Sequence, residues 1–454
     1  MTAVTAEVMP TAQETAARVR AGEISTVEAT AAALERVRSR EPEVNAFTVV
    51  MEEEALAEAA ALQKNPRLKQ MPLAGVPVTI KDNTNVAGQP TRNGTAASPD
   101  GPALADDELV RRLRAAGCVV IGKTMVSEGC LWPFAEGDFG IARNPWNLDH
   151  TPGGSSAGAA AALAAGMGPL ALGADGLGSI RIPSAWSGVF GLKPGRGLLP
   201  PVEAVGDWFG LSQWGPMATT VTDAALMLDA LTATSTYGSI EAPTRPLKIA
   251  LSLTPPATGV RLDREIRAAV EASADALRAQ GHTIHVIDPP YQQRLVVALM
   301  TRWLASAAED ARADDWSKLS KRIRDMAGVG AWVSRRRLVK EQAAAGWRRR
   351  MGTWMAAEGI DAIMMPSTAR TAPRVGRFKD KSYIVTMLGS TMLAPYAAAW
   401  NLAGFPAASV PAGLSLAGMP IGVQLVSAPG RESTILSIAR QLEQVRPWPR
   451  HAPD

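Results

Sequence analysis

The stretch that decides the fold is Thr151–Pro194, which reads TPGGSSAGAAAALAAGMGPLALGADGLGSIRIPSAWSGVFGLKP. Ser155 and Ser156 lie in one glycine-bracketed cluster and Ser179 lies in a second. Glycines allow backbone N–H groups to approach a ligand closely, so these clusters are where we expect chemistry. The apolar run Ala157–Leu172 separates them and is too short for a membrane span, which needs about 20 residues. We expect this run to form a buried core helix with its exit turn.

The composition predicts an ordered chain with a large core. Of the 454 residues, 46% are hydrophobic and 20% are charged. The net charge of +4 is small for this length, so no nucleic-acid partner is expected. Only Cys118 and Cys130 are present, so we expect no disulfide framework and a reducing, cytoplasmic compartment. The first ten residues lack the basic and apolar regions of a signal peptide.

The histidines and cysteines do not suggest a metal centre. His282 and His285 are the only close pair of histidines, and their spacing is shorter than zinc ligands usually have. The two cysteines are far apart from them and from each other. We therefore expect no metal and no cofactor.

The order of the predicted elements indicates one α/β domain over residues 1–454. A helix predicted at Asp263–Gln280 lies between strands predicted at Leu247–Leu253 and His282–Ile287. Strands and helices that alternate in this way build a layered sheet. We expect a mixed, mostly parallel, twisted sheet with helices on both faces, and a helical scaffold at residues 1–65.

Residues 301–355 differ in character from the rest of the chain. They hold five of the twelve tryptophans and contain 13 Lys and Arg against 6 Asp and Glu. Two interpretations stay open: a cap or partner surface that attracts acidic groups, or solvated helix faces with the tryptophans turned inward. We expect a helical elaboration of the domain near the mouth of the active site.

Lys81 occupies an unusual position, at the end of the β-branched strand predicted for Val76–Ile80. On this segment alone, a lysine that extends its amine to the surface and a functional lysine are equally good interpretations.

Two short motifs are look-alikes of known sites. Gly117–Thr124 fits the phosphate-binding pattern G-x-x-x-x-G-K-[ST], but its central residues are strand formers whose N–H groups belong in a sheet. Gly154–Gly158 fits the nucleophile elbow G-x-S-x-G, which would make Ser156 a nucleophile. The base would then be His282, His285 or His451, although turn formers rather than a strand precede the motif.

Four segments resemble the amidase signature family. They are Leu73–Asn83 (LAGVPVTIKDN), Gly122–Glu128 (GKTMVSE), the opening stretch Thr151–Pro194, and Asn401–Val426 (NLAGFPAASVPAGLSLAGMPIGVQLV). They extend from about residue 70 to the C-terminal region, so the resemblance covers nearly the whole chain, and the long central motif is highly specific. The resemblance implies the amidase signature fold and a Ser-cisSer-Lys triad without histidine.

Carried over by position, the resemblance makes Ser179 the nucleophile, Ser155 the bridging serine that usually has a cis peptide bond, and Lys81 the base. The spacing between the two serines matches the family pattern without gaps, which leaves Ser156 as a supporting neighbour. A serine needs a base to become a nucleophile, and a lysine can act as that base only when it is neutral. Burial lowers a lysine pKa from about 10.4, so this chemistry favours a buried Lys81.

The resemblance places the oxyanion hole in the backbone N–H groups of Gly176, Leu177, Gly178 and Ser179. The family usually reads Asp-Thr-Gly-Gly-Ser here, whereas this chain has Asp175-Gly-Leu-Gly-Ser179. A side chain at position 177 is harmless at negative φ, strains the loop at positive φ, and could narrow the acyl pocket.

Other residues receive supporting roles. Asp175 and Arg181 flank the nucleophile loop and are expected to hold it in place. Cys130 falls where the family has a substrate-pocket residue, although buried filler is an equally ordinary role for a thiol. Ala157 and Ala159 replace a glycine and a small polar residue of the family pattern, which is a milder departure.

The reaction implied by the resemblance is hydrolysis of a linear carboxamide through an acyl-enzyme, which releases a carboxylic acid and ammonia or an amine. The expected partner is a small-molecule amide, with a homodimer left open. Three alternatives remain at this stage: an amidotransferase subunit that needs ATP and partner subunits, a histidine-dependent serine esterase that uses Ser156, and a catalytically silent member of the family.

Overall fold

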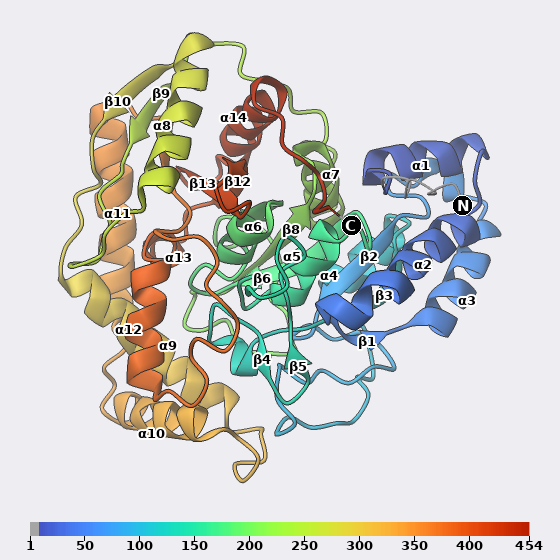
Figure 1. The fold of residues 1–454 in the computed structure, drawn as a ribbon, viewed down its shortest axis with the longest axis horizontal. Helices are drawn as coiled ribbons and strands as arrows, with labels where there is room; N and C mark the ends of the chain where they lie inside the picture. The colour runs from blue at the N-terminus through green and yellow to red at the C-terminus, as the bar shows by residue number, and fades with distance from the viewer. Residues whose placement is uncertain (1–8, 454) are drawn as a thin grey trace.

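The structure is a computed structural model that describes residues 9–453, and an 11-stranded sheet runs through its centre (Figure 1). Across the sheet the strands follow the order β1-β3-β2-β6-β8-β7-β12-β13-β11-β9-β10. Their bounds are β1 Phe47–Val50, β2 Pro77–Lys81, β3 Val119–Thr124, β6 Leu170–Asp175, β7 Phe190–Lys193, β8 Gln213–Ala218, β9 Lys248–Leu251, β10 Thr283–Val286, β11 Ala362–Pro366, β12 Ala407–Leu414 and β13 Pro420–Ser427. A separate hairpin pairs β4 Glu136–Gly137 with β5 Gly140–Ile141.

The sheet is mixed, as expected. Parallel pairing joins β3, β2 and β6 in one block and β11, β9 and β10 in another. Every pairing from β6 through β8, β7, β12 and β13 to β11 is antiparallel, as is the pairing of β1 with β3. Antiparallel pairs therefore make up more of the sheet than the sequence suggested, partly because a short turn joins β12 directly to β13.

Helices cover both faces of this sheet (Figure 1). They are α1 Ala12–Ala21, α2 Thr26–Val44, α3 Glu52–Gln63, α4 Glu108–Ala115, α5 Ala157–Ala164, α6 Arg181–Ser187, α7 Val221–Thr232, α8 Arg264–Ala279, α9 Arg294–Asp310, α10 Lys321–Arg335, α11 Glu341–Glu358, α12 Tyr383–Leu393, α13 Ala398–Ala403 and α14 Glu432–Val445. Among residues 9–453, no helix combines the length and apolarity that a membrane crossing would need.

Successive residues of β11 belong in turn to two different apolar clusters. On β11, Ala362 and Met364 belong to the apolar cluster that also includes residues of α4, α7, α8 and α14, whereas Ile363 and Met365 belong to the cluster that includes residues of α9, α10, α11 and α13. Successive side chains of a strand point to opposite faces, so both faces of this strand are buried. The fold class expected from the sequence, an α/β sheet with helices on both faces, is confirmed.

The two N-terminal helices begin with side-chain caps. Thr11 with Glu14, and Ser25 with Glu28, form complete capping boxes at the starts of α1 and α2. Each box satisfies backbone N–H groups that have no partner inside the helix. Gly22 ends α1 in the left-handed conformation, which suits a glycine.

The apolar run Ala157–Leu172 is not one helix with its exit turn, as the sequence suggested. The helix α5 ends at Ala164, and the last residues of the run, from Leu170, begin the central strand β6. Gly166 and Gly168 separate the two elements at positive φ, where residues with side chains are strained. Hydrophobicity alone could not separate these elements because both are completely buried.

The phosphate-loop look-alike is a strand, as its residues predicted. Val119–Thr124 forms β3, whose backbone pairs with β1 and β2. Lys123 is buried and makes a 2.7 Å ion pair with Asp82. Both the backbone and the lysine therefore have partners within the fold.

Gly158 lies where α5 comes close to the backbone at Ala46 and Met125. A Cβ atom at this position would lie 2.0 Å from Ala46 O and 2.5 Å from Met125 N. We expect Gly158→Ala to lower the free energy of unfolding by about 1–3 kcal/mol through overpacking. A decrease in the thermal unfolding midpoint would measure this effect.

Gly352 in α11 provides the matched control, because a Cβ atom there would meet nothing within 4 Å. Gly352→Ala should keep or raise the midpoint, since alanine favours a helix by up to about 1 kcal/mol over glycine. Equal midpoints for the two variants would contradict the close packing of α5.

Candidate active site

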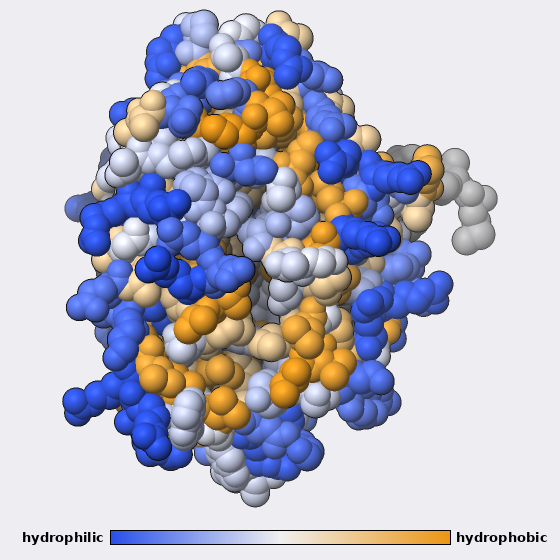
Figure 2. Space-filling model, turned by 90° about the vertical axis from the view of Figure 1, so that its left-hand side faces the viewer, coloured by the Kyte–Doolittle hydropathy of each residue, from blue (hydrophilic) through white to orange (hydrophobic). Residues whose placement is uncertain are grey.

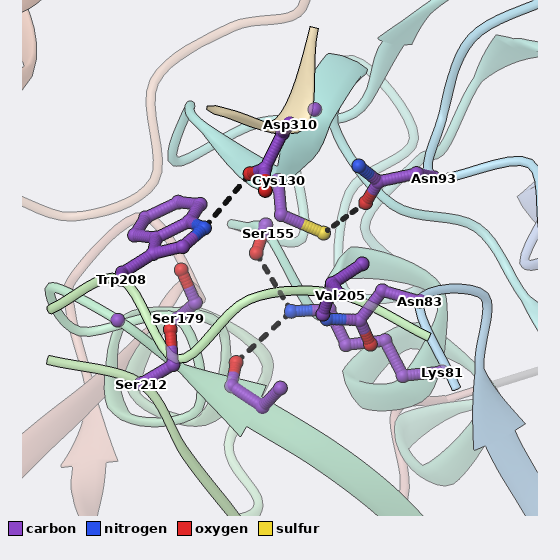
Figure 3. A pocket seen from close by; sticks show the side chains of 13 residues that line it. Lys81, Asn83, Asn93, Cys130, Ser155, Ser179, Val205, Trp208, Ser212 and Asp310 are labelled. Carbon is purple, nitrogen blue, oxygen red and sulfur yellow. Dashed lines mark hydrogen bonds between the residues drawn. The ribbon is translucent and has the colours of Figure 1, made fainter. Parts of the chain in front are cut away.

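Lys81 is the last residue of β2, and its side chain turns inward. It is 1% exposed, and its Nζ donates hydrogen bonds to Ser155 Oγ at 2.7 Å and to Ala174 O at 2.9 Å (Figure 3). Both acceptors come from the Thr151–Pro194 stretch. The interpretation of Lys81 as a surface lysine is therefore wrong.

The environment of Lys81 favours its neutral form. Burial lowers the pKa of Lys81, and the nearby Cys130 and Asp175 oppose this only in part. A neutral amine can accept a proton, so a lysine in this position can act as a general base.

Ser155 and Ser156 have different surroundings. The Gly154–Ser155 peptide bond is cis, and Ser155 lies against Lys81. Ser156 Oγ donates to Ala174 O at 3.2 Å and accepts from Ala174 N at 3.3 Å, while Ser156 N donates to Ser179 O at 3.2 Å. Ser156 thus ties the start of α5 to β6 and to the loop that carries Ser179, as expected of a supporting residue.

Ser179 lies where two pockets meet. The polar pocket occupies about 290 Å³ including its mouth, and the apolar pocket about 650 Å³. Residues of the polar pocket include Lys81, Asn83, Asn93, Ser155, Ser212 and Asp310 (Figure 3). Residues of the apolar pocket include Leu131, Trp132, Leu177, Ile182, Trp303 and Met387. Among the described residues no protein group hydrogen-bonds to Ser179 Oγ, which leaves this hydroxyl available to a ligand.

The apolar pocket reaches the surface beside α9 and α12. Met300 of α9 and Met387 of α12 are partly exposed and line it. Ile384, Leu388 and Met392 continue along the exposed side of α12. Figure 2 faces the side of the molecule that carries these helices and shows apolar patches between charged side chains. The segment 301–355 contributes the buried Trp303 to the lining of this pocket.

The loop Gly176–Ser179 follows β6 and leads into α6. The N–H groups of Gly176, Leu177 and Ser179 have no acceptor within the part of the chain that the structure describes. Gly178 N, in contrast, donates to Asp175 Oδ1 at 2.6 Å. Of the expected oxyanion-hole donors, Gly178 is therefore already occupied, because its amide points back toward Asp175.

The two departures from the family pattern in this loop are accommodated. Leu177 is not among the residues at positive φ, so the loop is not strained there, and its side chain lines the apolar pocket. Gly178, at φ 124°, is the position that needs a glycine. At Gly176 a Cβ atom would lie 2.6 Å from the Trp208 ring, so this indole fills the space beside the loop.

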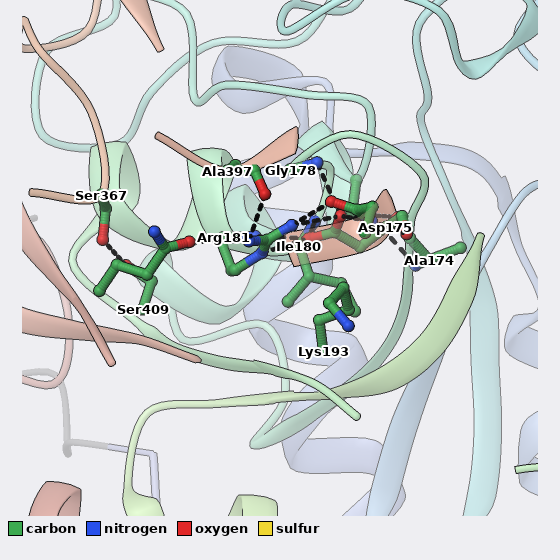
Figure 4. Close-up of polar contacts among 12 residues, drawn as sticks. Ala174, Asp175, Gly178, Ile180, Arg181, Lys193, Ser367, Ala397 and Ser409 are labelled. Atoms are coloured by element: carbon green, nitrogen blue, oxygen red, sulfur yellow. Dashed lines mark hydrogen bonds and ion pairs between the residues drawn. The ribbon is translucent and has the colours of Figure 1, made fainter. Parts of the chain in front are cut away.

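A buried ion pair between Asp175 and Arg181 holds the loop in place. Arg181 donates to both carboxylate oxygens of Asp175, each at 2.9 Å, and to Gln424 Oε1 at 2.7 Å (Figure 4). Asn401 Nδ2 donates to Asp175 Oδ1 and to Asp175 O, each at 2.8 Å. Burial would raise the pKa of Asp175, but the Arg181 charge and these hydrogen bonds outweigh it and hold that pKa below its ordinary value. The loop-holding positions expected for Asp175 and Arg181 agree with these contacts.

Several residues at this site have no sequence pattern that indicates their role. Asn401 and Gln424 fall in segments that were recognised for their resemblance, but the local pattern carried no signal for their contacts. Trp208 and Asp310 come from segments outside the motifs, and Trp208 Nε1 donates to Asp310 Oδ2 at 2.8 Å. Burial, with smaller contributions from Asp314 and Glu309, raises the pKa of Asp310 to about 7.

Cys130 lies in the wall between the two pockets and lines both of them. Its Sγ donates to Asn93 Oδ1 at 3.2 Å. Burial raises the pKa of this thiol, although the Lys81 charge acts in the opposite direction. This position supports its interpretation as a pocket residue more than as core filler.

His282, one of the three histidines proposed for the nucleophile-elbow alternative, is hydrogen-bonded elsewhere in the fold. His282 Nδ1 accepts from Leu247 N at 3.0 Å, and its Nε2 contacts Gln441 Oε1 at 2.6 Å. None of the residues that line either pocket at Ser179 is a histidine. Because the Ser156 hydroxyl is also buried and hydrogen-bonded to Ala174, the geometry does not favour this alternative.

Comparison with known sequences agrees with this geometry. The family model described as Amidase matches residues 28–436. The chain is 41% identical over 432 residues to a Mycobacterium tuberculosis protein called "Putative amidase AmiB2", with 92% of each chain covered. It is 30% identical over 436 residues to a glutamyl-tRNA(Gln) amidotransferase subunit of Agathobacter rectalis, with 87% of this chain and 86% of that protein covered. The chain belongs to the amidase family of amidase signature hydrolases.

Solved structures show the same fold. The structure of 6-aminohexanoate cyclic dimer hydrolase matches with a TM-score of 0.87 and 29% identity, covering 98% of this chain and 99% of that one. A bacterial aryl acylamidase of the amidase signature family matches with a TM-score of 0.85 and 25% identity, covering 97% of both chains. Matches over nearly the full length of each chain support the architecture as a whole.

The Asp175–Arg181 pair gives a stability prediction. Arg181→Met would leave a completely buried carboxylate without its cation, which typically costs about 3–5 kcal/mol. We expect a large decrease in the thermal unfolding midpoint. Arg267→Met is the control, because Arg267 and Glu271 form an exposed pair at 3.7 Å, and such pairs contribute about 1 kcal/mol or less. Similar decreases in both variants would show that the buried pair has no special role.

Proposed function

We propose that the protein hydrolyses a linear carboxamide through an acyl-enzyme on Ser179, with Lys81 as the base and Ser155 as the proton relay. The observation that carries this proposal is the 2.7 Å hydrogen bond from the buried Lys81 amine to Ser155 Oγ, in the pocket that Ser179 lines. Burial lowers the pKa of Lys81, which supplies the neutral amine that the mechanism requires.

The proposed reaction has two halves. In the first, Ser179 Oγ bonds to the amide carbon while its proton moves through Ser155 to Lys81. The N–H groups of Gly176, Leu177 and Ser179 are the candidate donors to the oxyanion. The C–N bond then breaks, and the leaving nitrogen takes the proton back through Ser155. In the second half, water bonds to the acyl carbon and gives a proton through Ser155 to Lys81. The bond between the acyl carbon and Ser179 Oγ then breaks, Oγ takes that proton back, and the carboxylic acid leaves.

Substitution of the three residues tests the mechanism. Ser179→Ala, Ser155→Ala and Lys81→Met should each lower kcat/KM for a simple amide such as hexanamide by about a thousandfold or more, because each removes part of one proton path. The exposed Ser317→Ala is the matched control and should keep wild-type turnover. Retention of activity in Lys81→Met would refute the proposed base.

A covalent probe separates the nucleophile from the other serines. A fluorophosphonate should add to Ser179 in the wild-type protein, and peptide mass spectrometry should find the adduct on that residue. Labelling should be lost in Lys81→Met, since the serine then has no base. Labelling of Ser156 would favour the esterase alternative, and a protein that is not labelled would be a silent member of the family.

The amidotransferase alternative draws on the 30% identity to the Agathobacter rectalis protein. It predicts that activity depends on ATP and on partner subunits. Release of ammonia from hexanamide by the purified chain, without ATP, is the outcome that our proposal expects.

The proposal also predicts the pH dependence of kcat/KM. Lys81 must be neutral, so activity should rise with pH through the Lys81 pKa and level off below about 10.4, the ordinary value for a lysine. Asp310, whose pKa burial raises to about 7, also titrates in this range and can add a second limb to the pH profile of kcat/KM. The limb that belongs to Lys81 should therefore persist in Asp310→Asn. A profile that falls with rising pH in both proteins would contradict the role of Lys81.

A further inference from the structure

An outer cavity lies beside the polar pocket. Asn93, Val205 and Asp310 line both spaces, and we call these three residues the neck. The outer cavity occupies about 1100 Å³ including its open mouth. Its charged lining residues are Glu203, Glu309, Asp310 and Asp314, and no lysine or arginine lines it. We call this cavity the acidic vestibule.

Asp310 lies in the neck, where its carboxylate can contact a substrate. It ends α9 and is partly buried, and Trp208 Nε1 donates to its Oδ2 at 2.8 Å. Its second oxygen, Oδ1, receives no hydrogen bond from residues 9–453. An acceptor that is unused and surrounded by other carboxylates gains most from a cationic donor.

Trp208, which donates a hydrogen bond to Asp310, is itself buried. It lies at φ 54°, a left-handed conformation that is strained for a residue with a side chain. Its ring occupies the space beside Gly176. Asp310 is therefore held by an indole that itself packs against the loop of Ser179.

The reaction assigns the two pockets to the two halves of an amide. The leaving nitrogen must receive its proton through Ser155, and both Ser155 and Lys81 line the polar pocket. The leaving amine thus lies on the side of the neck and the acidic vestibule. The acyl group then lies in the apolar pocket, which Leu177 and Trp303 line.

We propose that Asp310 and the acidic vestibule select amides whose leaving amine carries a second, protonated amino group, namely N-acylated diamines with an apolar acyl chain. This inference rests on the proposed function and names its substrate class. In the net reaction the amide C–N bond breaks, and water adds its hydroxyl to the acyl carbon and its proton to the nitrogen. The products are a fatty or aryl carboxylic acid and a diamine.

A matched pair of substrates tests the inference. N-(aminobutyl)hexanamide carries a terminal ammonium, and N-pentylhexanamide replaces it with a methyl group. At a pH above about 7, the raised pKa of Asp310, its carboxylate is charged, and the wild-type protein should favour the cationic amide in kcat/KM by about tenfold or more, the usual effect of a hydrogen bond to a charged group. This preference should decrease as salt is added, because ions screen the carboxylates.

Variants assign the preference to Asp310. Asp310→Asn keeps an acceptor for Trp208 but removes the charge, so the ratio of the two kcat/KM values should fall to within about threefold of unity. Glu203→Gln, at an exposed position of the vestibule, should lower the ratio by a smaller factor. Asp325→Asn on α10 is the matched control, because its carboxylate pairs with Lys321 and does not line the vestibule. It should keep the wild-type ratio.

The outcomes separate the two proposals. If N-pentylhexanamide is cleaved with a dependence on Ser179 but the cationic amide is not preferred, the inference is overturned while the proposed function stands. Calorimetric binding of putrescine to Ser179→Ala provides a readout without catalysis. Putrescine should bind at least about tenfold more tightly than butanol, and adding Asp310→Asn should remove that difference. Equal binding of both compounds to Ser179→Ala would overturn the inference even if no amide is turned over.

Discussion

The buried Asp175–Arg181 ion pair is the interaction on which the rest of the site depends. It joins the end of β6 to the start of α6, and Asn401 and Gln424 extend it to α13 and β13. Two charges without water are stable only when every donor and acceptor finds a partner, which is what these contacts achieve. Because the same carboxylate accepts from Gly178 N, the pair also determines the shape of the loop between them.

The buried amine of Lys81 has surroundings of the opposite kind. The amine of Lys81 has two neutral acceptors, Ser155 Oγ and Ala174 O, and within residues 9–453 no carboxylate is hydrogen-bonded to it. Burial therefore lowers the pKa of this amine, and the nearby Cys130 and Asp175 offset the effect only in part. The contrast with Lys123 is instructive, since that buried lysine has Asp82 as its counter-ion. Burial lowers the pKa of both lysines, but the carboxylate of Asp82 opposes this effect directly at Lys123, whereas the hydrogen-bond acceptors of Lys81 are neutral.

Features that depend on local sequence could be predicted, and those that depend on packing could not. The strand that ends at Lys81 and the glycine clusters around Ser155 and Ser179 follow from neighbouring residues, so their positions were anticipated. The start of β6 was missed because burial on all sides removes the periodicity that distinguishes a helix from a strand. Trp208 and Asp310 reach the site from segments with no motif, and only the folded chain brings them beside the loop.

The Trp208 ring fills the space that a side chain at Gly176 would need, and this restricts which substitutions the protein tolerates. Any side chain at position 176 would meet the indole at 2.6 Å, so a threonine at this position is blocked while Trp208 remains. The indole must become smaller first, and that step also removes the hydrogen bond that holds Asp310. The two positions are therefore epistatic, and the order of substitutions is constrained. Lineages that carry this glycine and tryptophan together should retain them as a pair.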